Sequence, residues 1–362
     1  MANHTILSGG NAGGIGEYKM KIGILTGGGD APGLNAVLRA IIRKGLLNYG
    51  YEIVGIEDGW KGLIEGNFIP LNMKSLVGLL AKGGTILGTS RTNPFKSEDG
   101  AKKILKNVSE QGIDAVIAIG GDDTLGVASK LCDMGLPVVG VPKTIDNDLV
   151  GTDYTFGFQT AVSIACEAIE RLRTTAESHH RVMILEVMGR NSGWIALESG
   201  IAGGANAILI PEKPFDIDEV CEFINKRQKR GRNFSIIVAA EGAKPKGEAE
   251  FVYASGVDEF GHERLGGVAS YIGKEIEKRF KNIETRTVVL GHIQRGGPPI
   301  PYDRVLATRF GIAAIDLVHD GKFGQMVALQ GNAMVSIPLK DIIGKRKTVD
   351  SKLYDVAATF FG

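Results

Sequence analysis

The stretch "DAVIAIGGDDTLGVASKL", residues 114–131, decides the fold of this chain. A short apolar run ends at two glycines and two aspartates, and a segment with helical periodicity follows them. A buried strand that turns through glycine into a helix is the repeating unit of parallel α/β sheets. The stretch therefore predicts an α/β fold that carries polar groups at the carboxyl end of a strand.

The same pattern recurs along the chain. Further apolar, β-branched runs that end in Gly, acid or base lie at residues 21–28, 52–59, 136–144, 181–187, 234–242 and 285–292. Longer segments with helical periodicity separate them, for example residues 34–50 and 163–178. This alternation is typical of βαβ units, in which ligands bind at the carboxyl ends of the strands. We therefore expect mainly parallel sheets, with the function located where these runs end.

The length and local composition of the chain limit its possible domain organisation. A chain of 362 residues is long enough for two domains, and a boundary near Gly157 is plausible. Residues 1–19 are rich in Gly and Asn and precede the first strand, so we interpret them as a flexible leader outside the fold. Residues 241–267 are the most loop-like internal stretch and predict a surface excursion.

Charge and cysteine content exclude several classes of function. With 42 Lys and Arg against 41 Asp and Glu, the net charge of +1 creates no global field that would attract nucleic acid or an anionic membrane. The three cysteines have no C-x-x-C spacing, so neither a disulfide framework nor a zinc site is indicated. No apolar run approaches the ~18 residues of a membrane span. We expect a cytoplasmic protein whose ligand is a small molecule.

The first strand end reads "GILTGGGDAPGLNAVLRA", residues 23–40. It predicts a strand, three glycines and a helix that opens between Asp30 and Asn35, with Pro32 suited to the first turn. Free N–H groups at such a helix start could bind an anion. A tight turn that needs glycine for its backbone angles explains the stretch equally well. No Gly-Lys-[Ser/Thr] follows, so this is not a Walker loop.

Two adjacent carboxylates, Asp122 and Asp123, stand at the second strand end. A single aspartate at a helix start is usually a cap. Two in succession repel one another unless a cation or hydrogen-bond donors compensate. The pair therefore indicates a magnesium ion or a phosphate-bound cation.

The third strand end is "VPKTIDND", residues 141–148. Lys143 can reach a phosphate and Thr144 can donate a hydroxyl. Asp146 and Asp148 lie two residues apart, on one face if the chain stays extended, which suits one carboxylate acting on a proton and another near a metal. An Asp/Asn-rich turn would explain "DND" but not the Lys-Thr before it.

Eight motifs in order carry a resemblance to a known family. They are "TGGGDAPGLNA" (26–36), "GGTILGTSR" (83–91), "GGDDT" (120–124), "PKTIDND" (142–148), "GTDYTFGFQTA" (151–161), "HHRVMILEVMGRNSGW" (179–194), "VLGHIQRGG" (289–297) and "PYDR" (301–304). Together they closely resemble the phosphofructokinase family, from about residue 21 through residue 320. "GGDDT" alone is also close to a signature of diacylglycerol and NAD kinases, but neither explains "PKTIDND" together with "GHIQRGG".

The resemblance implies the overall organisation. The fold would be two Rossmann-like three-layer domains with mainly parallel sheets and the active site between them. Residues 20–157 plus about 294–344 would form the phosphoryl-donor-binding domain, and residues 158–293 plus about 345–362 the sugar-phosphate-binding domain. The family also implies a homodimer or homotetramer with shared active sites.

The resemblance assigns catalytic roles one by one. Asp146 would be the general base that takes the proton from the 1-hydroxyl of fructose 6-phosphate, and Asp122 would hold Mg²⁺, the implied cofactor. Arg91 would neutralise charge on the phosphoryl group in flight, and Thr144 would position the reacting end of the sugar. The residues implied to bind the phosphoryl donor are Gly28, Gly29, Gly121, Asp123, Thr124 and Lys143.

The sugar-phosphate site follows in the same way. Its implied residues are Thr144, Asp146, Met188, Gly189, Arg190, Glu241, His292 and Arg295, with Glu241 accepting sugar hydroxyls and His292 and Arg295 binding the 6-phosphate. Arg181 and Arg286 match arginines that reach into the neighbouring subunit's sugar site. Without this context, each arginine would be interpreted as an ordinary surface ion-pair residue.

Asp123 bears on the phosphoryl donor. Family members that use ATP have glycine at the matching position, which leaves room for the α-phosphate. A carboxylate there would repel the α-phosphate, whereas pyrophosphate ends before reaching it, and Lys143 would supply a compensating cation. The pair resembles the pyrophosphate-dependent subgroup. The alternatives are an ATP-dependent enzyme and a non-catalytic sugar-phosphate-sensing subunit, which would lack the base that Asp146 provides.

The effector site of the family looks incomplete. Arg39, Arg43 and Arg173 resemble basic residues of the effector site in bacterial ATP-dependent enzymes, but Met73 stands where an arginine is expected. We therefore expect no strong allosteric control by nucleotides.

Overall fold

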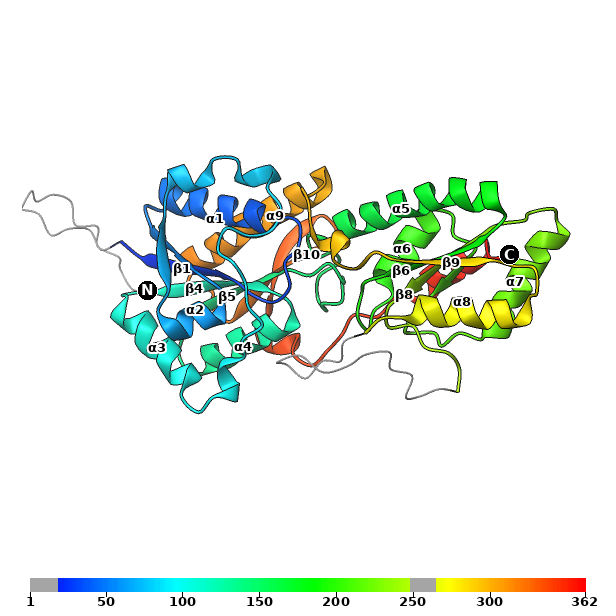
Figure 1. The fold of residues 1–362 in the computed structure, drawn as a ribbon. Coiled ribbons are helices and arrows are strands. Elements are labelled where there is room, and N and C mark those ends of the chain that lie inside the picture. Colours follow the sequence, from blue (N-terminus) through cyan, green and yellow to red (C-terminus); the bar gives the residue numbers. More distant parts are fainter. Residues whose placement is uncertain (1–18, 248–264) are drawn as a thin grey trace, which may run out of the picture.

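The computed structural model describes residues 19–247 and 265–362 (Figure 1). Nearly all of the predicted leader, residues 1–18, lies outside the described residues, and so do residues 248–264 of the predicted surface excursion. Within the described part of the chain, no helix combines the length and the apolar character needed to cross a membrane.

The strands form two sheets. A seven-stranded sheet has the order β11-β10-β5-β4-β1-β2-β3, and a four-stranded sheet has the order β7-β8-β6-β9. The strands are β1 (Lys21–Thr26), β2 (Glu52–Ile56), β3 (Phe68–Leu71), β4 (Ala115–Gly120), β5 (Val138–Pro142), β6 (Val182–Val187), β7 (Ala207–Leu209), β8 (Ser235–Ala240), β9 (Thr285–Val289), β10 (Gln325–Gln330) and β11 (Ala333–Pro338). All pairings are parallel except those of the edge strands β3 and β11.

Helices cover both faces of each sheet (Figure 1). They are α1 (Leu34–Asn48), α2 (Trp60–Glu65), α3 (Gly100–Glu110), α4 (Asp122–Asp133), α5 (Phe158–His179), α6 (Trp194–Ala202), α7 (Ile217–Lys229), α8 (Val268–Arg279), α9 (Pro301–His319) and α10 (Ser351–Ala358). Helices α1 and α9 lie on one face of the seven-stranded sheet, and α2, α3 and α4 on the other. Helices α5, α6 and α10 pack on one face of the four-stranded sheet, and α7 and α8 on the other. We call these assemblies the seven-stranded unit and the four-stranded unit.

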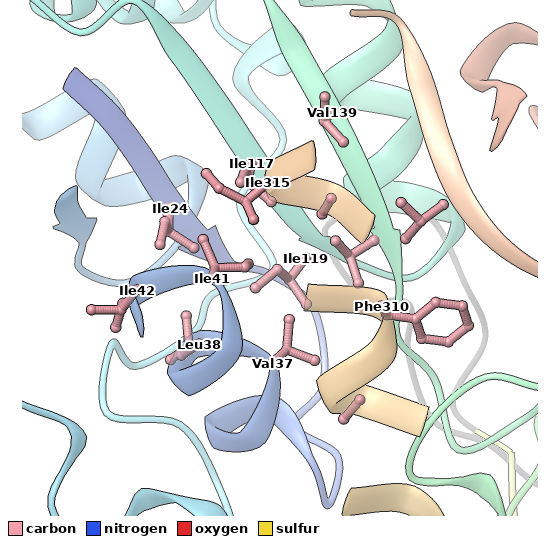
Figure 2. Close-up of a cluster of buried hydrophobic side chains, with 14 of the residues drawn as sticks. Ile24, Val37, Leu38, Ile41, Ile42, Ile117, Ile119, Val139, Phe310 and Ile315 are labelled. Carbon is pink, nitrogen blue, oxygen red and sulfur yellow. The ribbon is translucent and has the colours of Figure 1, made fainter. Parts of the chain in front are cut away.

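The central strand β4 shows why its sequence is apolar throughout. Its residues alternate between faces, so that Ile117 and Ile119 pack with α1 and α9 while Val116 and Ala118 pack with the helices opposite. Figure 2 shows the first of these cores, with Phe310 of α9 among the side chains that close it. A strand buried on both faces keeps no polar position except at its ends, which places its functional groups there.

The chain connects the two units three times. It leaves the seven-stranded unit after β5, builds β6 to β9, and returns through residues 290–300 to form α9, β10 and β11. Residues 343–350, which we call the crossover segment, then lead from Ile342 in one core to Val349 in the other, where α10 packs. The assignment of the units to donor and sugar phosphate remains a prediction.

The α/β fold with mainly parallel sheets is confirmed, and each predicted run forms a strand. The predicted start of the first helix between Asp30 and Asn35 is confirmed, and only the place of Pro32 in its first turn needs a correction. Helix α1 begins at Leu34, because Gly33 immediately before it has φ 113°, a left-handed angle that no helical residue adopts. Pro32 therefore precedes the helix and is not in its first turn. Strands β3, β7, β10 and β11 were not predicted from the sequence.

Candidate active site

The three polar strand ends meet at one edge of the seven-stranded sheet. Strands β5, β4 and β1 are neighbours and parallel, so their carboxyl ends lie side by side. A cleft with an empty volume of about 480 Å³ opens there. It is lined by Gly28, Gly29, Arg91, Gly121, Asp122, Asp123, Thr124, Lys143, Thr144, Asp146, Asp148, Arg190 and Arg295. The structure thus brings together all the residues predicted to bind the donor, together with the predicted catalytic residues.

The backbone N–H groups of the first glycines are already used. The N–H of Gly27 donates to the carbonyl of Ile119 at 2.9 Å, and that of Gly28 donates to the carbonyl of Ser90 at 3.0 Å. These two groups are therefore not free donors for an anion, contrary to the simplest interpretation of the glycine motif. The loop instead fixes the adjacent strand end and the segment that carries Arg91.

Carbonyl groups of the same loop hold two cations. Lys143 Nζ donates to the carbonyl of Gly29, and Arg295 Nη1 donates to the carbonyl of Asp30 at 3.0 Å. A Cβ atom on Gly29 would lie 2.6 Å from Arg295 Nη1, so a larger residue there would displace the guanidinium from this position. The loop therefore acts as a rigid support that holds positive charge at the cleft.

Lys143 is a cation with little access to water. It is 3% exposed, and burial together with the nearby Arg295 lowers its pKa to about 7, while Asp146 acts in the opposite direction. Such a group gains from a bound anion, because the anion offsets both the desolvation and the repulsion from Arg295. This is the behaviour expected of a side chain that binds phosphate.

The loop after β5 presents Asp146 with one oxygen unused. The N–H of Asp146 donates to Thr144 Oγ1 at 3.0 Å, and Asn147, which has φ 53°, accepts from the N–H of Thr155 at 3.1 Å. Asp146 is only 5% exposed, yet its Oδ1 has no hydrogen-bond partner within the described residues. A buried, unpaired carboxylate oxygen in a cleft is costly and indicates a group that awaits a ligand.

The carboxylates of the cleft fit a magnesium ion. Asp122, Asp123, Asp146 and Asp148 all line it, and burial followed by repulsion from Asp146 and Asp122 raises the pKa of Asp148 to about 7. No three His, Cys, Asp or Glu side chains among the described residues lie close enough to hold a metal by themselves. Mg²⁺ usually binds one or two carboxylates plus water and substrate phosphates, so the aspartates of this cleft are suitable ligands for it.

Apart from Thr144 and Asp146, which line the cleft, the sugar-phosphate residues predicted for this chain's own site lie at the carboxyl ends of β6 and β8 and in the turn after β9. The N–H of Arg190, which has φ 51°, donates to Glu241 Oε1 at 2.9 Å, which links the two strand ends. Met188 and Gly189 precede Arg190, and His292 is exposed in the turn that also contains Arg295. Arg190 and Arg295 line the cleft itself and join this group to the donor side.

Gln294 belongs to the same group and was not among the predicted site residues. It is fully buried, and its Oε1 accepts from the N–H of Met188 at 2.8 Å while its Nε2 has no partner within the described residues. The only sequence signal for it is its position inside "GHIQRGG". It fixes the turn after β9 against the end of β6.

Arg181 and Arg286 are not brought into the cleft of this chain. They stand at the amino ends of β6 and β9, and both pair with Glu284. A strand of six residues separates them from the carboxyl edge, a distance of about 20 Å. Their predicted role in a neighbouring subunit's site remains a prediction.

The comparisons with known proteins agree with this geometry. The phosphofructokinase family model matches residues 21–318, which include the whole four-stranded sheet, strands β1 to β5 of the seven-stranded sheet and every residue of the cleft. The chain belongs to the phosphofructokinase family. It is therefore a phosphotransferase of the phosphofructokinase kind.

Curated relatives of this phosphofructokinase use two different donors according to their names. The pyrophosphate–fructose 6-phosphate 1-phosphotransferase of Streptomyces coelicolor is 56% identical over 344 residues, 95% of this chain and 100% of that protein. That of Amycolatopsis methanolica is 57% identical over 343 residues, again 95% and 100%. The ATP-dependent 6-phosphofructokinase of Mycobacterium tuberculosis H37Rv is 54% identical over 344 residues, with the same coverage. Such similar identities leave the donor open.

Solved structures support the fold. The phosphofructokinase of Saccharomyces cerevisiae matches with a TM-score of 0.78 and 31% identity, over 94% of this chain and 47% of that longer chain. A structure named as a pyrophosphate-dependent phosphofructokinase from Marinobacter aquaeolei matches with a TM-score of 0.79 over 95% of this chain and 92% of that one. At 21% identity, the second likeness concerns the fold alone.

Glu241 gives this phosphofructokinase a testable pH dependence of stability. Burial, opposed by the Arg190 N–H, raises the pKa of Glu241 to about 7. The folded state therefore holds a proton on Glu241 that the unfolded state releases near pH ~4.3. The contribution of this proton to the free energy of unfolding is fully present below pH ~4.3 and is lost as pH rises through about 7. Glu241→Gln cannot ionise at this position. We therefore expect its free energy of unfolding, relative to that of wild type, to increase by about 2 to 3 kcal/mol as pH rises from 5 to 8.

Urea unfolding of both proteins at the two pH values measures this difference. Glu222→Gln on α7 is the control, because the side chain of Glu222 is 70% exposed. A stability difference that does not change with pH would show that Glu241 ionises normally in the folded protein.

Proposed function

We propose that this enzyme transfers a phosphoryl group from pyrophosphate to the 1-hydroxyl of fructose 6-phosphate, with Mg²⁺, to give fructose 1,6-bisphosphate. The observation that carries the donor assignment is the position of Asp123. It lies in the first turn of α4 and lines the cleft together with Gly121 and Lys143. The cleft in which the donor is proposed to bind therefore carries a carboxylate as well as a cation.

Two physical arguments favour pyrophosphate over ATP. The negative charge of Asp123 would face the α-phosphate of a nucleotide, and repulsion of this kind is how a site rejects a competing ligand. Pyrophosphate has only two phosphates, and the Lys143 cation, which also lines the cleft, can serve both. ATP as donor is the second candidate, because a relative named as ATP-dependent is 54% identical.

The reaction needs few covalent changes. Asp146 would accept the proton of the 1-hydroxyl as that oxygen bonds to the transferred phosphorus, and the phosphorus–oxygen bond to the remaining phosphate would break. Arg91 and Lys143 would stabilise the charge on the phosphoryl oxygens. Mg²⁺, which Asp122 would hold, supplies further charge neutralisation. We expect the reaction to be reversible.

The acceptor site would lie on the four-stranded unit. Met188, Gly189 and Arg190 would contact the sugar, Glu241 would accept its hydroxyls, and the 6-phosphate would bind at the turn after β9. Arg181 and Arg286 of a second copy would complete the pocket, so a homodimer or homotetramer is part of the proposal. Composition supports a cytoplasmic location, with three cysteines and no C-x-x-C spacing.

The decisive variant is Asp123→Gly. We expect wild type to form fructose 1,6-bisphosphate with pyrophosphate and not with ATP, because of the carboxylate at residue 123. In the variant we expect ATP use to appear, with a gain of about 10- to 100-fold in kcat/KM for ATP from removing one repulsive charge. Initial rates with each donor, at saturating fructose 6-phosphate and magnesium, measure both quantities.

Asp133→Gly at the other end of α4 is the matched control, because it removes a carboxylate from the same helix but outside the cleft. It should leave the donor preference unchanged. Wild-type activity with ATP alone would overturn the pyrophosphate assignment and leave the family membership intact.

A further inference from the structure

The crossover segment passes along the loop that carries the proposed catalytic base. The N–H of Lys347 donates to the carbonyl of Asp148 at 2.8 Å, and the carbonyl of Lys347 accepts from Trp194 Nε1 at 3.1 Å. Trp194 is the first residue of α6 in the four-stranded unit. One residue of the crossover segment therefore bonds to the catalytic loop on one side and to the other unit on the opposite side.

The side chain of Lys347 fixes the segment further. Its Nζ donates to the carbonyl of Asp153 at 2.5 Å and to that of Thr152 at 3.2 Å, and it lies 5.1 Å from the ring centre of Trp194 and 5.9 Å from that of Tyr154. These contacts combine hydrogen bonds with cation–π attraction in a partly desolvated place. The backbone at residues 346 and 347 is consequently held in one position against the loop.

Arg346 uses this position to contact the cleft wall. Its Nε lies 3.8 Å from Oδ2 of Asp148, although the two residues are 198 positions apart (346 − 148). The Asp148 side chain is 12% exposed and lines the cleft, whereas Arg346 is 40% exposed and is not among the lining residues. The guanidinium therefore approaches this carboxylate from outside the cleft.

The charges of the cleft indicate what the contact between Arg346 and Asp148 contributes. Asp148 shares the cleft with three other carboxylates, and Asp146 and Asp122 both repel it. The cations of the cleft are Arg91, Lys143, Arg190 and Arg295. Lys143 and Arg295 are held by the loop of residues 27–30 after β1, and Arg346 pairs with Asp148 from the crossover segment.

We propose that Arg346 is a positioning residue for phosphoryl transfer, which holds the carboxylate of Asp148 in place at the cleft from the crossover segment. The proposal rests on the proposed function in one respect, that Asp148 faces the reacting phosphates. Arg346 itself touches neither substrate. Its effect on the reaction passes through Asp148.

The first test is the kinetics of Arg346→Met and Arg346→Lys. We expect the Met variant to lose about 10- to 100-fold in kcat while KM for fructose 6-phosphate changes less than about threefold, as for other residues that orient a group at a reaction centre. The Lys variant keeps a cation and should recover most of the loss. Since a partly exposed ion pair contributes little stability, the melting temperature of both variants should stay within about 2 °C of wild type.

The second test is a double-mutant cycle with Asp148→Asn. If Arg346 acts through Asp148, adding Arg346→Met to Asp148→Asn should change kcat by less than about twofold. Effects that multiply would overturn the proposal, and so would an Arg346→Lys variant as slow as Arg346→Met. Lys345→Met, at an exposed neighbouring position of the crossover segment, is the control and should behave as wild type.

The donor proposal fails separately from this one. Wild type is assayed first with pyrophosphate and with ATP, and the variants are compared with whichever donor it uses. Activity with ATP alone would overturn the pyrophosphate assignment, while the comparison of the Arg346 variants would still decide the role of Arg346.

Discussion

Replacing Asp146 by asparagine is expected to lower kcat by about 10²- to 10⁴-fold, the usual contribution of a general base. Asparagine has the same shape but cannot accept the proton of the attacking hydroxyl. KM for fructose 6-phosphate should change little, because the amide still fills the same space. Initial rates of fructose 1,6-bisphosphate formation, at saturating donor and magnesium, measure the loss.

Stability separates this effect from a folding defect. Oδ1 of Asp146 is buried and has no partner within the described residues, so replacing the charge by a neutral amide should not destabilise the protein. We therefore expect an unchanged or slightly higher melting temperature together with the loss of activity. Asp341→Asn, at an exposed carboxylate outside the cleft, should affect neither. An Asp146→Asn enzyme that keeps more than about a tenth of the activity would exclude general-base catalysis by this residue.

Replacing Lys143 by methionine is expected to lower kcat/KM for pyrophosphate by about 10²- to 10³-fold, comparable to the loss of one preorganised electrostatic group. Methionine has a similar length and suits a buried site, so the cleft should keep its shape. The loss arises because the buried cation that is proposed to bind the phosphates of the donor would be absent. Kinetics with pyrophosphate as the varied substrate measure it.

The same variant should gain stability at neutral pH. The pKa of Lys143 is lowered to about 7 in the folded protein, against about 10.4 when unfolded, so the unfolded state binds more protons between these values. Wild-type stability should therefore rise as pH increases from 7 towards 10, by about 3 to 5 kcal/mol from this group. Lys143→Met should lack this rise and should exceed wild type in stability at pH 7. Lys340→Met, at an exposed position, should show the wild-type profile, and an identical profile for Lys143→Met would mean that Lys143 titrates normally.

Much of the fold could be predicted because central parallel strands have an unmistakable composition. Strand β4 is apolar along its whole length and ends at Gly120, and β1 is apolar between Lys21 and Thr26 and is followed by glycine. The missed strands lack this signal. Strand β7 has only three residues, and β11 is an edge strand without a fully buried residue. Their positions depend on partners far away in the sequence.

The cleft could be predicted for a related reason. Polar residues such as Lys143 and Asp122 directly follow strands that are neighbours in the sheet, so the topology alone gathers them at one edge. Contacts between segments that are distant in the sequence could not be predicted from the order of the strands. Neither the use of the Gly28 N–H by Ser90 nor the approach of Arg346 to Asp148 leaves any local pattern in the sequence.

The three connections between the two units bear on how the chain folds while it is being made. Strand β5 pairs with β10 at Val139 and Gln325, which are 186 positions apart (325 − 139). At a synthesis rate of about 5–20 residues per second, the ribosome needs roughly 10 to 40 s to supply the second strand after the first. The sheet of the four-stranded unit, whose strands all lie between Val182 and Val289, can pair within that interval. Throughout it, the nascent chain exposes the apolar edge of β5, which is open to pairing with other chains until β10 covers it.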